Sequence, residues 1–305
     1  MATTTSATTA ARKLSALLQS FERRRPMRAG SLIVTIYGDA IVPRGGSLWL
    51  GSLLELMAGF GVEPGLVRTA ASRLVADGWF ERTRIGKQSY YRLSAWGAAE
   101  FAAATARIYQ AAERPWSGEM EVAIVTTPDV AERAARRERL LRGGWGQAAA
   151  NVMVRPHMET PAGRAAASDA GIVLVTRPQS AETARALARA CWRLDDLAAA
   201  YAQFVRVFGP VAGEIAEGAR LSDAPAFQLR TLLIHDWRRI VLRDPLLPRA
   251  MLPEGWPGLR ALGLVSGVYP RILAASERWL GGHAINEDGP LPPATPALNE
   301  RFRTA

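Results

Sequence analysis

The spacing of apolar and polar positions changes once within residues 63–94. Across residues 64–78, apolar side chains recur at helical spacing, and four of them share one face: Val67, Ala70, Ala71 and Leu74. Pro64 stands at the first turn and Gly78 follows the last, as is typical of the two ends of a helix. The pattern therefore predicts an amphipathic helix.

The opposite face of this helix carries only arginines and small side chains: Arg68, Thr69, Ser72 and Arg73, with Ala76 between them. An ordinary solvated face mixes both charges with long polar residues. Arginines and short hydroxyls can instead approach a nucleic-acid backbone closely and still reach base edges. We expect this face to contact DNA.

The next residues change to a strand pattern. Two β-branched or aromatic-rich runs, Trp79–Arg84 and Gln88–Leu93, flank a turn in which Gly86 is free to adopt a positive φ. The predicted hairpin sets four cations against the single Glu81: Arg82, Arg84, Lys87 and Arg92. Tyr90 and Tyr91 occupy successive strand positions, so one is expected in the core and the other near a sugar-phosphate.

A preceding helix completes the motif. Ser47 is a candidate cap for a helix through Leu56, and Gly59 and Gly61 would end it. Its expected buried residues are Leu48, Leu50, Leu53, Leu54 and Met57. Two helices followed by a basic hairpin indicate a winged helix-turn-helix, with the second helix in the major groove and the wing over phosphates. The alternative is a structural helix and hairpin of any small α+β domain.

A second domain is expected after a helix that begins at Ser94. Residues 120–126 alternate like a strand, residues 130–142 form a charged helix, and Asn151–Arg155 and Ile172–Thr176 are β-type runs. Ser180 can cap a helix through Trp192. The order strand, helix, strand, strand, helix predicts a small ferredoxin-like α/β sandwich whose last strand is not evident.

The remaining chain is expected to be helical. Residues 196–207, 225–242 and 259–280 have helical patterns, and nothing after Asp195 resembles a strand. The overall prediction is a multidomain α+β protein with these parts: a flexible basic arm over 1–29, a winged domain over 30–112, a ferredoxin-like domain over 113–195, a helical domain over 196–281 and a disordered tail over 282–305. In the arm, Arg23, Arg24 and Arg25 either touch phosphates or are simply solvated.

Composition narrows the class of protein. The chain has 305 residues and a formal net charge of +10, which favours a polyanionic partner such as DNA. A single cysteine, Cys191, rules out an intramolecular disulfide and suits a reducing cytosol. His157, His235 and His283 are far apart and show no zinc spacing. No apolar run has the length of a membrane helix, so we expect a cytoplasmic protein without metal or cofactor.

Two groups of motifs resemble the PaaX-like family of bacterial repressors that control phenylacetate and related aromatic catabolism. The N-terminal group is SLIVTIYGDAIVPRGGSLWLGSLL (31–54), VRTAASRLVADGW (67–79) and SYYRLSAWG (89–97). The C-terminal group is LIHDWRRIVLRDPLLP (233–248) and LPEGWPG (252–258). One departure is Gly144-Trp145-Gly146, where the family usually has glycine-phenylalanine-glycine.

The resemblance implies a winged helix domain, a central Cas2-like ferredoxin fold and a helical C-terminal domain. It further implies a homodimer on double-stranded, palindromic operator DNA that is released by an aryl-CoA thioester, typically phenylacetyl-CoA. Such a ligand needs arginines at one end and apolar walls at the other. Five residues of one segment fit that composition: His235, Trp237, Arg238, Arg239 and Arg243. Alternatively, these residues form an interdomain ion-pair network, in which Asp236 can pair with Arg239.

Enzymatic functions find little support in the sequence. A Cas2-like metal-dependent nuclease needs a carboxylate at the end of the first strand of the central domain. That strand ends Val125-Thr126-Thr127, and Asp129 follows only after a proline. For a CoA-ester-processing enzyme no nucleophile elbow, Ser/His/Asp set or acid–base carboxylate pair is present. We therefore predict no catalytic residues.

Overall fold

The structure is a computed structural model that describes residues 2–24, 28–109, 116–157 and 171–303. It combines helices with small antiparallel sheets, and the chain divides into two compact units. The first unit comprises Met1–Ala111, Gln203–Leu242 and Leu259–Ala305, and the second comprises Ala112–Ala202 and Arg243–Gly258. The N-terminal and C-terminal segments, which we expected as separate domains, thus belong largely to one unit.

The first unit begins with helix α1 (Ala2–Glu22), which replaces the flexible arm expected for residues 1–29. Four side chains at helical spacing are buried: Ala10, Leu14, Leu17 and Phe21. Lys13 pairs with Glu214, and Arg24 donates two hydrogen bonds to Asp236, at 2.8 and 2.9 Å. Asp236 is therefore bound to Arg24, and Arg25 lies outside the described residues. The helix was not predicted because the many serines and threonines between its apolar positions are typical of a flexible segment.

The next segment forms a three-stranded sheet with helices around it. In chain order the elements are α2 (Ala29–Ile36), the π-helix η1 (Tyr37–Ile41), η2 (Val42–Arg44), β1 (Ser47–Trp49), α3 (Leu50–Ala58), α4 (Pro64–Ala76), β2 (Phe80–Ile85), β3 (Gln88–Leu93) and α5 (Ala95–Tyr109). The antiparallel sheet has the order β1-β3-β2, with Ser47 opposite Arg92 and Phe80 opposite Leu93.

Ser47 does not cap a helix. It lies in β1, its hydroxyl donates to the Glu287 carboxylate at 2.5 Å, and α3 begins only at Leu50. The preceding Gly45 and Gly46 both have positive φ and lead the chain into the strand. Of the side chains expected to be buried here, Leu48, Leu53 and Met57 have no exposed surface, whereas Leu50 and Leu54 are half-buried.

Helices from the C-terminal half complete the first unit. These are the end of α9 (Leu194–Ala216), α10 (Asp223–Val241) and α11 (Pro257–His283), and α10 packs against α2 and α5. The last residues form a short hairpin, β8 (Ile285–Asn286) with β9 (Gly289–Pro290), and the turn η4 (Pro296–Leu298). Leu291, Leu298 and Phe302 are buried. The expectations of a disordered tail and of no strand after Asp195 were therefore wrong.

A buried carboxylate, Asp39, ties these segments together. Its Oδ1 accepts the hydroxyls of Tyr109 and Tyr269, at 2.7 and 2.8 Å, and Nη1 of Arg301 at 3.0 Å. Its Oδ2 accepts Nε of Arg230 at 2.6 Å. Burial alone would raise the pKa of Asp39, but Arg230, Arg301 and the two hydroxyls together lower it below its ordinary value. Asp39 therefore joins η1, α5, α10, α11 and the C-terminal segment.

The second unit is built on a four-stranded antiparallel sheet. Its elements are β4 (Met120–Ile124), α6 (Val130–Arg142), β5 (Gly146–Ala149), β6 (Val152–Pro156), β7 (Ile172–Thr176), α8 (Ala181–Cys191) and η3 (Arg249–Met251). The strand order is β5-β6-β4-β7. The bounds predicted for α6 and β7 agree with the structure, and Ser180 caps α8 by accepting the N–H of Thr183 at 3.1 Å. Our prediction placed the missing strand last in this domain, whereas the strand that it lacked is β5, which comes before β6 and has few apolar residues.

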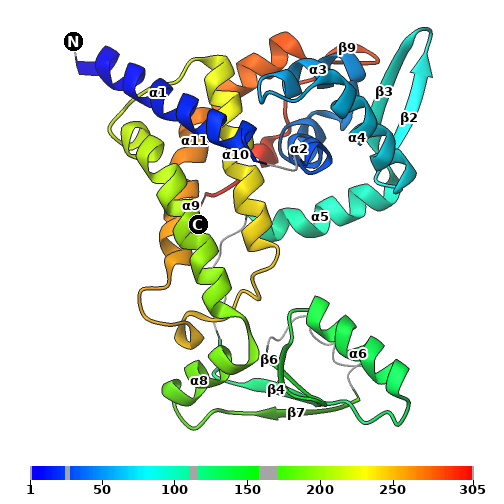
Figure 1. The fold of residues 1–305 in the computed structure, drawn as a ribbon, viewed down its shortest axis with the longest axis vertical. Coiled ribbons are helices and arrows are strands. Elements are labelled where there is room, and N and C mark those ends of the chain that lie inside the picture. The colour runs from blue at the N-terminus through cyan, green and yellow to red at the C-terminus, as the bar shows by residue number, and fades with distance from the viewer. Residues whose placement is uncertain (1, 25–27, 110–115, 158–170, 304–305) are drawn as a thin grey trace. The chain divides into compact units, whose positions relative to one another are not determined.

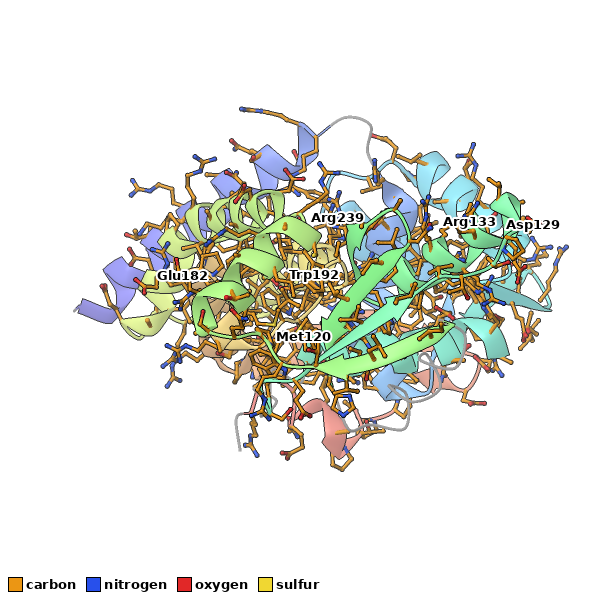
Figure 2. All side chains as sticks on the ribbon, turned by 90° about the horizontal axis from the view of Figure 1, so that it is seen from below. Met120, Asp129, Arg133, Glu182, Trp192 and Arg239 are labelled. Carbon is orange, nitrogen blue, oxygen red and sulfur yellow. The ribbon has the colours of Figure 1, made fainter. Side chains whose placement is uncertain are left out.

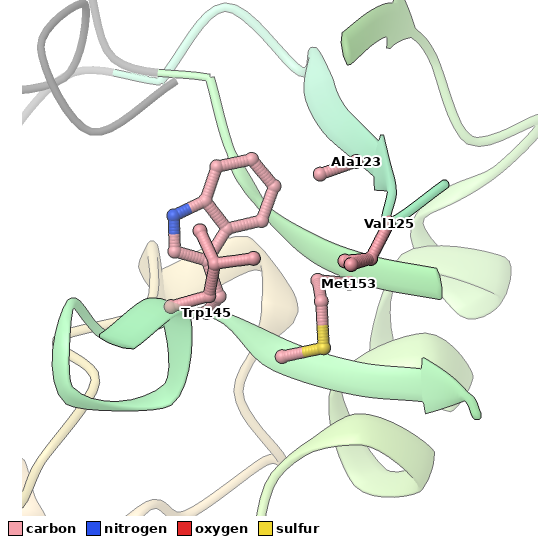
Figure 3. Packing of buried hydrophobic residues seen from close by; sticks show 5 residues of the cluster. Ala123, Val125, Trp145 and Met153 are labelled. Atoms are coloured by element: carbon pink, nitrogen blue, oxygen red, sulfur yellow. The ribbon is translucent and has the colours of Figure 1, made fainter. Parts of the chain in front are cut away.

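One face of this sheet packs its core against α6. Ala123, Val125 and Met153 of the sheet region surround Trp145, which is 1% exposed (Figure 3). The guanidinium of Arg155 lies 4.4 Å from the Trp145 ring centroid. A Cβ on Gly146 would come within 2.6 Å of Trp192, whose indole N–H donates to the Gly144 carbonyl. Close packing therefore accounts for Trp145 and Gly146, whereas Gly144 has a positive φ of 86°.

Asp129 marks the start of α6. Its carboxylate accepts the backbone N–H of Glu132 at 2.9 Å, and Arg133 lies one turn further along the helix (Figure 2). This contact is a helix cap, which satisfies a backbone N–H that would otherwise have no partner inside the helix. The first carboxylate after β4 therefore has a structural role.

Candidate nucleic-acid interface

Helix α4 separates an apolar face from a cationic one, as its sequence predicts. Val67 and Ala71 have no exposed surface, and Ala70 and Leu74 are each 8% exposed. On the other side, five exposed residues line a shallow concavity: Arg68, Thr69, Ser72, Arg73 and Ala76. The Thr69 hydroxyl donates to the Gly65 carbonyl of its own helix at 3.0 Å. All four predicted contact residues of the helix share one surface.

The hairpin of β2 and β3 extends beyond α4 (Figure 1). Ile85 pairs with Gln88 across the turn, and Gly86 has a φ of 59°, as predicted. The side chains of Arg82, Arg84 and Lys87 are exposed. Arg84 donates to the Gly86 carbonyl at 3.1 Å. Among the described residues, no carboxylate forms an ion pair with these three cations, and none does so with Arg68 or Arg73 of α4. Their charges are available to a polyanion.

Other hairpin residues differ from the prediction. Arg92 pairs with Glu287, a residue almost two hundred positions away that local sequence patterns could not connect to it. Tyr90 and Tyr91 are both buried, although successive strand residues normally face opposite sides. The Tyr90 hydroxyl donates to Gln88 at 2.6 Å, whereas the β1 strand and Tyr37 cover the backbone around Tyr91. Neither tyrosine is placed to reach a sugar-phosphate.

The arrangement suits electrostatic and groove recognition of a duplex. A helix about 10–12 Å wide fits the major groove, and cations on a flanking hairpin can lie along phosphates. Among the described residues, no group of three or more His, Cys, Asp or Glu is placed to hold a metal ion. No described helix has the length and apolarity to cross a membrane.

Comparison with known proteins identifies the family. The chain is 33% identical over 299 residues to the transcriptional repressor PaaX of Escherichia coli strain K12, and the match covers 95% of each chain. Family models described as PaaX-like protein and PaaX-like protein C-terminal domain match residues 28–97 and 192–282. The chain belongs to the PaaX-like family. This relationship supports a role in transcription regulation.

Among solved structures, the chain is similar to an uncharacterized protein, Rv0674, from Mycobacterium tuberculosis. The sequences are 25% identical, the match covers 75% of this chain and 88% of the other, and the TM-score is 0.47.

Within this PaaX-like chain, the five predicted effector residues do not form one site. His235 and Trp237 are buried, with His235 Nδ1 2.9 Å from the Thr35 hydroxyl and the Trp237 indole donating to the Ile108 carbonyl at 2.8 Å. Arg239 and Arg243 are exposed, and Arg243 belongs to the second unit. Arg238 lines a cavity whose walls include none of the other four residues. The helical period of α10 separates neighbours in sequence onto different faces.

Proposed function

We propose that this PaaX-like chain is a DNA-binding transcriptional repressor of an aromatic-acid catabolic operon of the phenylacetate type. We infer that residues 28–97 form a winged helix-turn-helix, in which α4 enters the major groove and the β2–β3 hairpin contacts phosphates. The observation that carries this proposal is the exposed set of cations on α4 and the hairpin, none paired with a carboxylate of the described residues. The similarity to a repressor along almost the whole chain supports it.

The experiment begins with selection of operator duplexes from a random library by the purified protein. Arg68→Ala and Arg73→Ala are then compared with Arg271→Ala, which removes an exposed arginine of α11. If an arginine reads a guanine, its loss costs about 1–3 kcal/mol on the selected duplex, or roughly 5- to 150-fold in affinity. Arg271→Ala should bind like the wild type. A library that yields no preferred sequence contradicts the proposal.

We further propose that the repressor acts as a homodimer on a palindromic operator. β7 lies at an edge of the sheet of the second unit, and Ile172, Leu174 and Val175 are each more than half exposed there. An exposed apolar edge strand is prone to pair with another chain. Light scattering should find two copies per particle, and the selected duplexes should contain two inverted half-sites. A monomer on a single half-site argues against this arrangement.

We propose, finally, that an aryl-CoA thioester such as phenylacetyl-CoA releases the repressor from its operator. In a mobility-shift titration, phenylacetyl-CoA should displace the protein from the selected duplex, and phenylacetate and free CoA should not. For the alternative nuclease, Asp129 caps α6, and no group of three or more His, Cys, Asp or Glu among the described residues is placed to hold a metal ion. Incubation of duplex DNA with Mg²⁺ or Mn²⁺ should leave it intact.

A further inference from the structure

A cavity of 290 Å³ lies in the first unit between α2, α5 and α10. Its walls are mainly apolar and include Val34, Ile234 and Leu242. Phe101 and Trp79, whose rings are in contact, also line it. An apolar cavity of about 150 Å³ in another protein is large enough to hold benzene. This cavity can therefore hold a ring-sized group together with a short substituent.

One wall of the cavity presents a largely buried cation. Arg238 donates from Nε to the Thr35 hydroxyl at 2.7 Å, and from Nη2 to the carbonyl and hydroxyl oxygens of Ser31 at 2.7 and 2.9 Å. All three acceptors are neutral, and no carboxylate of the described residues pairs with it. Burial lowers the pKa of Arg238 to about 10, because little opposite charge compensates for the lost hydration. An oxygen with negative charge would be stabilised beside it.

The other charged groups of the cavity do not neutralise Arg238. Asp39 is fully engaged by Arg230, Arg301 and two tyrosine hydroxyls. Glu100 is exposed at the rim. Arg107, which also lines the cavity, donates to the Val241 carbonyl. The cavity thus combines apolar walls with one cation, Arg238, whose hydrogen-bond acceptors are neutral, a composition suited to a small organic anion or a polarised carbonyl.

We propose that this cavity is the effector site, and that it takes the acyl part of the ligand: an aromatic or similarly compact apolar group, with its carbonyl or carboxylate oxygen at Arg238. The inference rests on the effector response proposed above and assigns its location. A free acid and a thioester share this chemistry, and the experiment distinguishes them.

The cavity is also in contact with the segment that presents α4. The Phe101 ring packs against the backbone of Gly38, where a Cβ would come within 2.1 Å of it. Phe101 meets Trp79 edge-on, with ring centroids 6.1 Å apart. Trp79 joins α4 to β2, and its N–H donates to the Leu74 carbonyl of α4 at 2.9 Å. A ligand that displaces Phe101 or Trp79 therefore shifts α4 and the hairpin, which weakens DNA binding.

The test measures binding of phenylacetyl-CoA, phenylacetate and free CoA to the full chain by calorimetry, without DNA. Ala104→Phe fills the cavity from α5, and Ala102→Phe places the same ring on an exposed position of that helix outside the lining. Arg238→Gln removes the buried cation, and Arg271→Gln removes an exposed one. We expect Ala104→Phe and Arg238→Gln to weaken binding at least tenfold, and Ala102→Phe and Arg271→Gln to leave it within twofold. Circular dichroism melts check that each variant is folded.

The outcomes separate the site from the function. If phenylacetyl-CoA binds but phenylacetate does not, the oxygen at Arg238 is a thioester carbonyl; if both bind, a carboxylate also serves. Wild-type affinity in folded Ala104→Phe overturns the site while leaving the effector response intact. Failure of the wild type to bind either acyl compound also overturns the inference. Operator binding is measured separately, so its absence would refute the repressor and not the cavity.

Discussion

His235 is a histidine that folding holds in its uncharged form. It is 3% exposed, packs edge-on against Phe21 and has Nδ1 2.9 Å from the Thr35 hydroxyl. Burial lowers its pKa to about 3, and the nearby cations Arg238, Arg239 and Arg24 act in the same direction against Asp236. Protonation of this side chain is therefore much easier in the unfolded chain.

The consequence is a loss of stability in acid. A group whose pKa is lowered by folding contributes stability above its unfolded pKa, near 6.5 for His235, and loses it as pH falls toward about 3. At pH 5 this single group should cost about 2 kcal/mol relative to pH 7. His235→Asn keeps a polar atom near Thr35 but has no group that titrates. Its free energy of unfolding in urea should therefore decrease less between pH 7 and pH 5 than that of the wild type. If the free energy of unfolding depended on pH equally in both proteins, His235 would not change its protonation on unfolding.

At the scale of residues, the sequence predicts which side chains share an exposed face better than it predicts which residues they contact. The seven proposed DNA contacts are exposed because helix and strand periods place them there, and a local pattern contains that information. Three arginines bind residues that are distant in the sequence. Arg24 pairs with Asp236, Arg92 pairs with Glu287, and Arg238 donates to Ser31 and Thr35 of α2. No local spacing could show that Arg238 faces a cavity and Arg239 does not.

At the scale of elements, the β2–β3 hairpin should supply affinity that depends on salt and little on sequence. Removing one cation that neutralises a phosphate lowers the slope of log affinity against log salt concentration by about 0.9. Replacing Arg82, Arg84 and Lys87 together by alanine should therefore lower that slope by about 2–3, with similar decreases in affinity for selected and unrelated duplexes. Arg68→Ala should instead affect the selected duplex more. A triple variant with an unchanged salt slope would remove the hairpin from the interface.

Elements with strong periodicity were predictable, and irregular ones were not. The apolar stripe of α4 identifies that helix, and β-branched or aromatic-rich runs identify the hairpin and β7. Asp129 and Ser180 provide capping side chains for α6 and α8. β1 and β5 contain only three and four residues and depend on pairing with β3 and β6. α1 is rich in threonine, and its stability comes from burying Leu14, Leu17 and Phe21 against other parts of the unit.

At the scale of the molecule, segments from both ends of the chain enclose the middle of the first unit. α1 contacts α10, and the C-terminal segment carries Arg301 to Asp39 and buries Phe302 beside Tyr109 and Tyr269. Glycine and proline made this segment appear disordered in the sequence, but turns need those residues as much as disorder does. Long-range contacts of this kind have no local sequence signal.

Arg301 therefore offers a test of whether the C-terminal segment stabilises the unit. Its Nη1 lies 2.6 Å from the Asp39 carbonyl and 3.0 Å from Oδ1, and its side chain is 9% exposed. Arg301→Gln leaves the buried carboxylate with one cation fewer and should lower the free energy of unfolding by about 3 kcal/mol in urea at pH 7. Arg303→Gln, two residues away, breaks only an exposed pair with Glu300 and should cost less than about 0.5 kcal/mol.

The pH dependence gives the Arg301 prediction a second, independent readout. Because folding lowers the pKa of Asp39, the stability from its ionised form is present above the ordinary value of 3.8 and is lost as pH falls below it. Without Arg301 that pKa rises toward the ordinary value. The stability difference between wild type and Arg301→Gln should thus narrow as pH falls below about 4. Coincident urea midpoints at pH 7 would show that the C-terminal segment packs on the unit without holding it together.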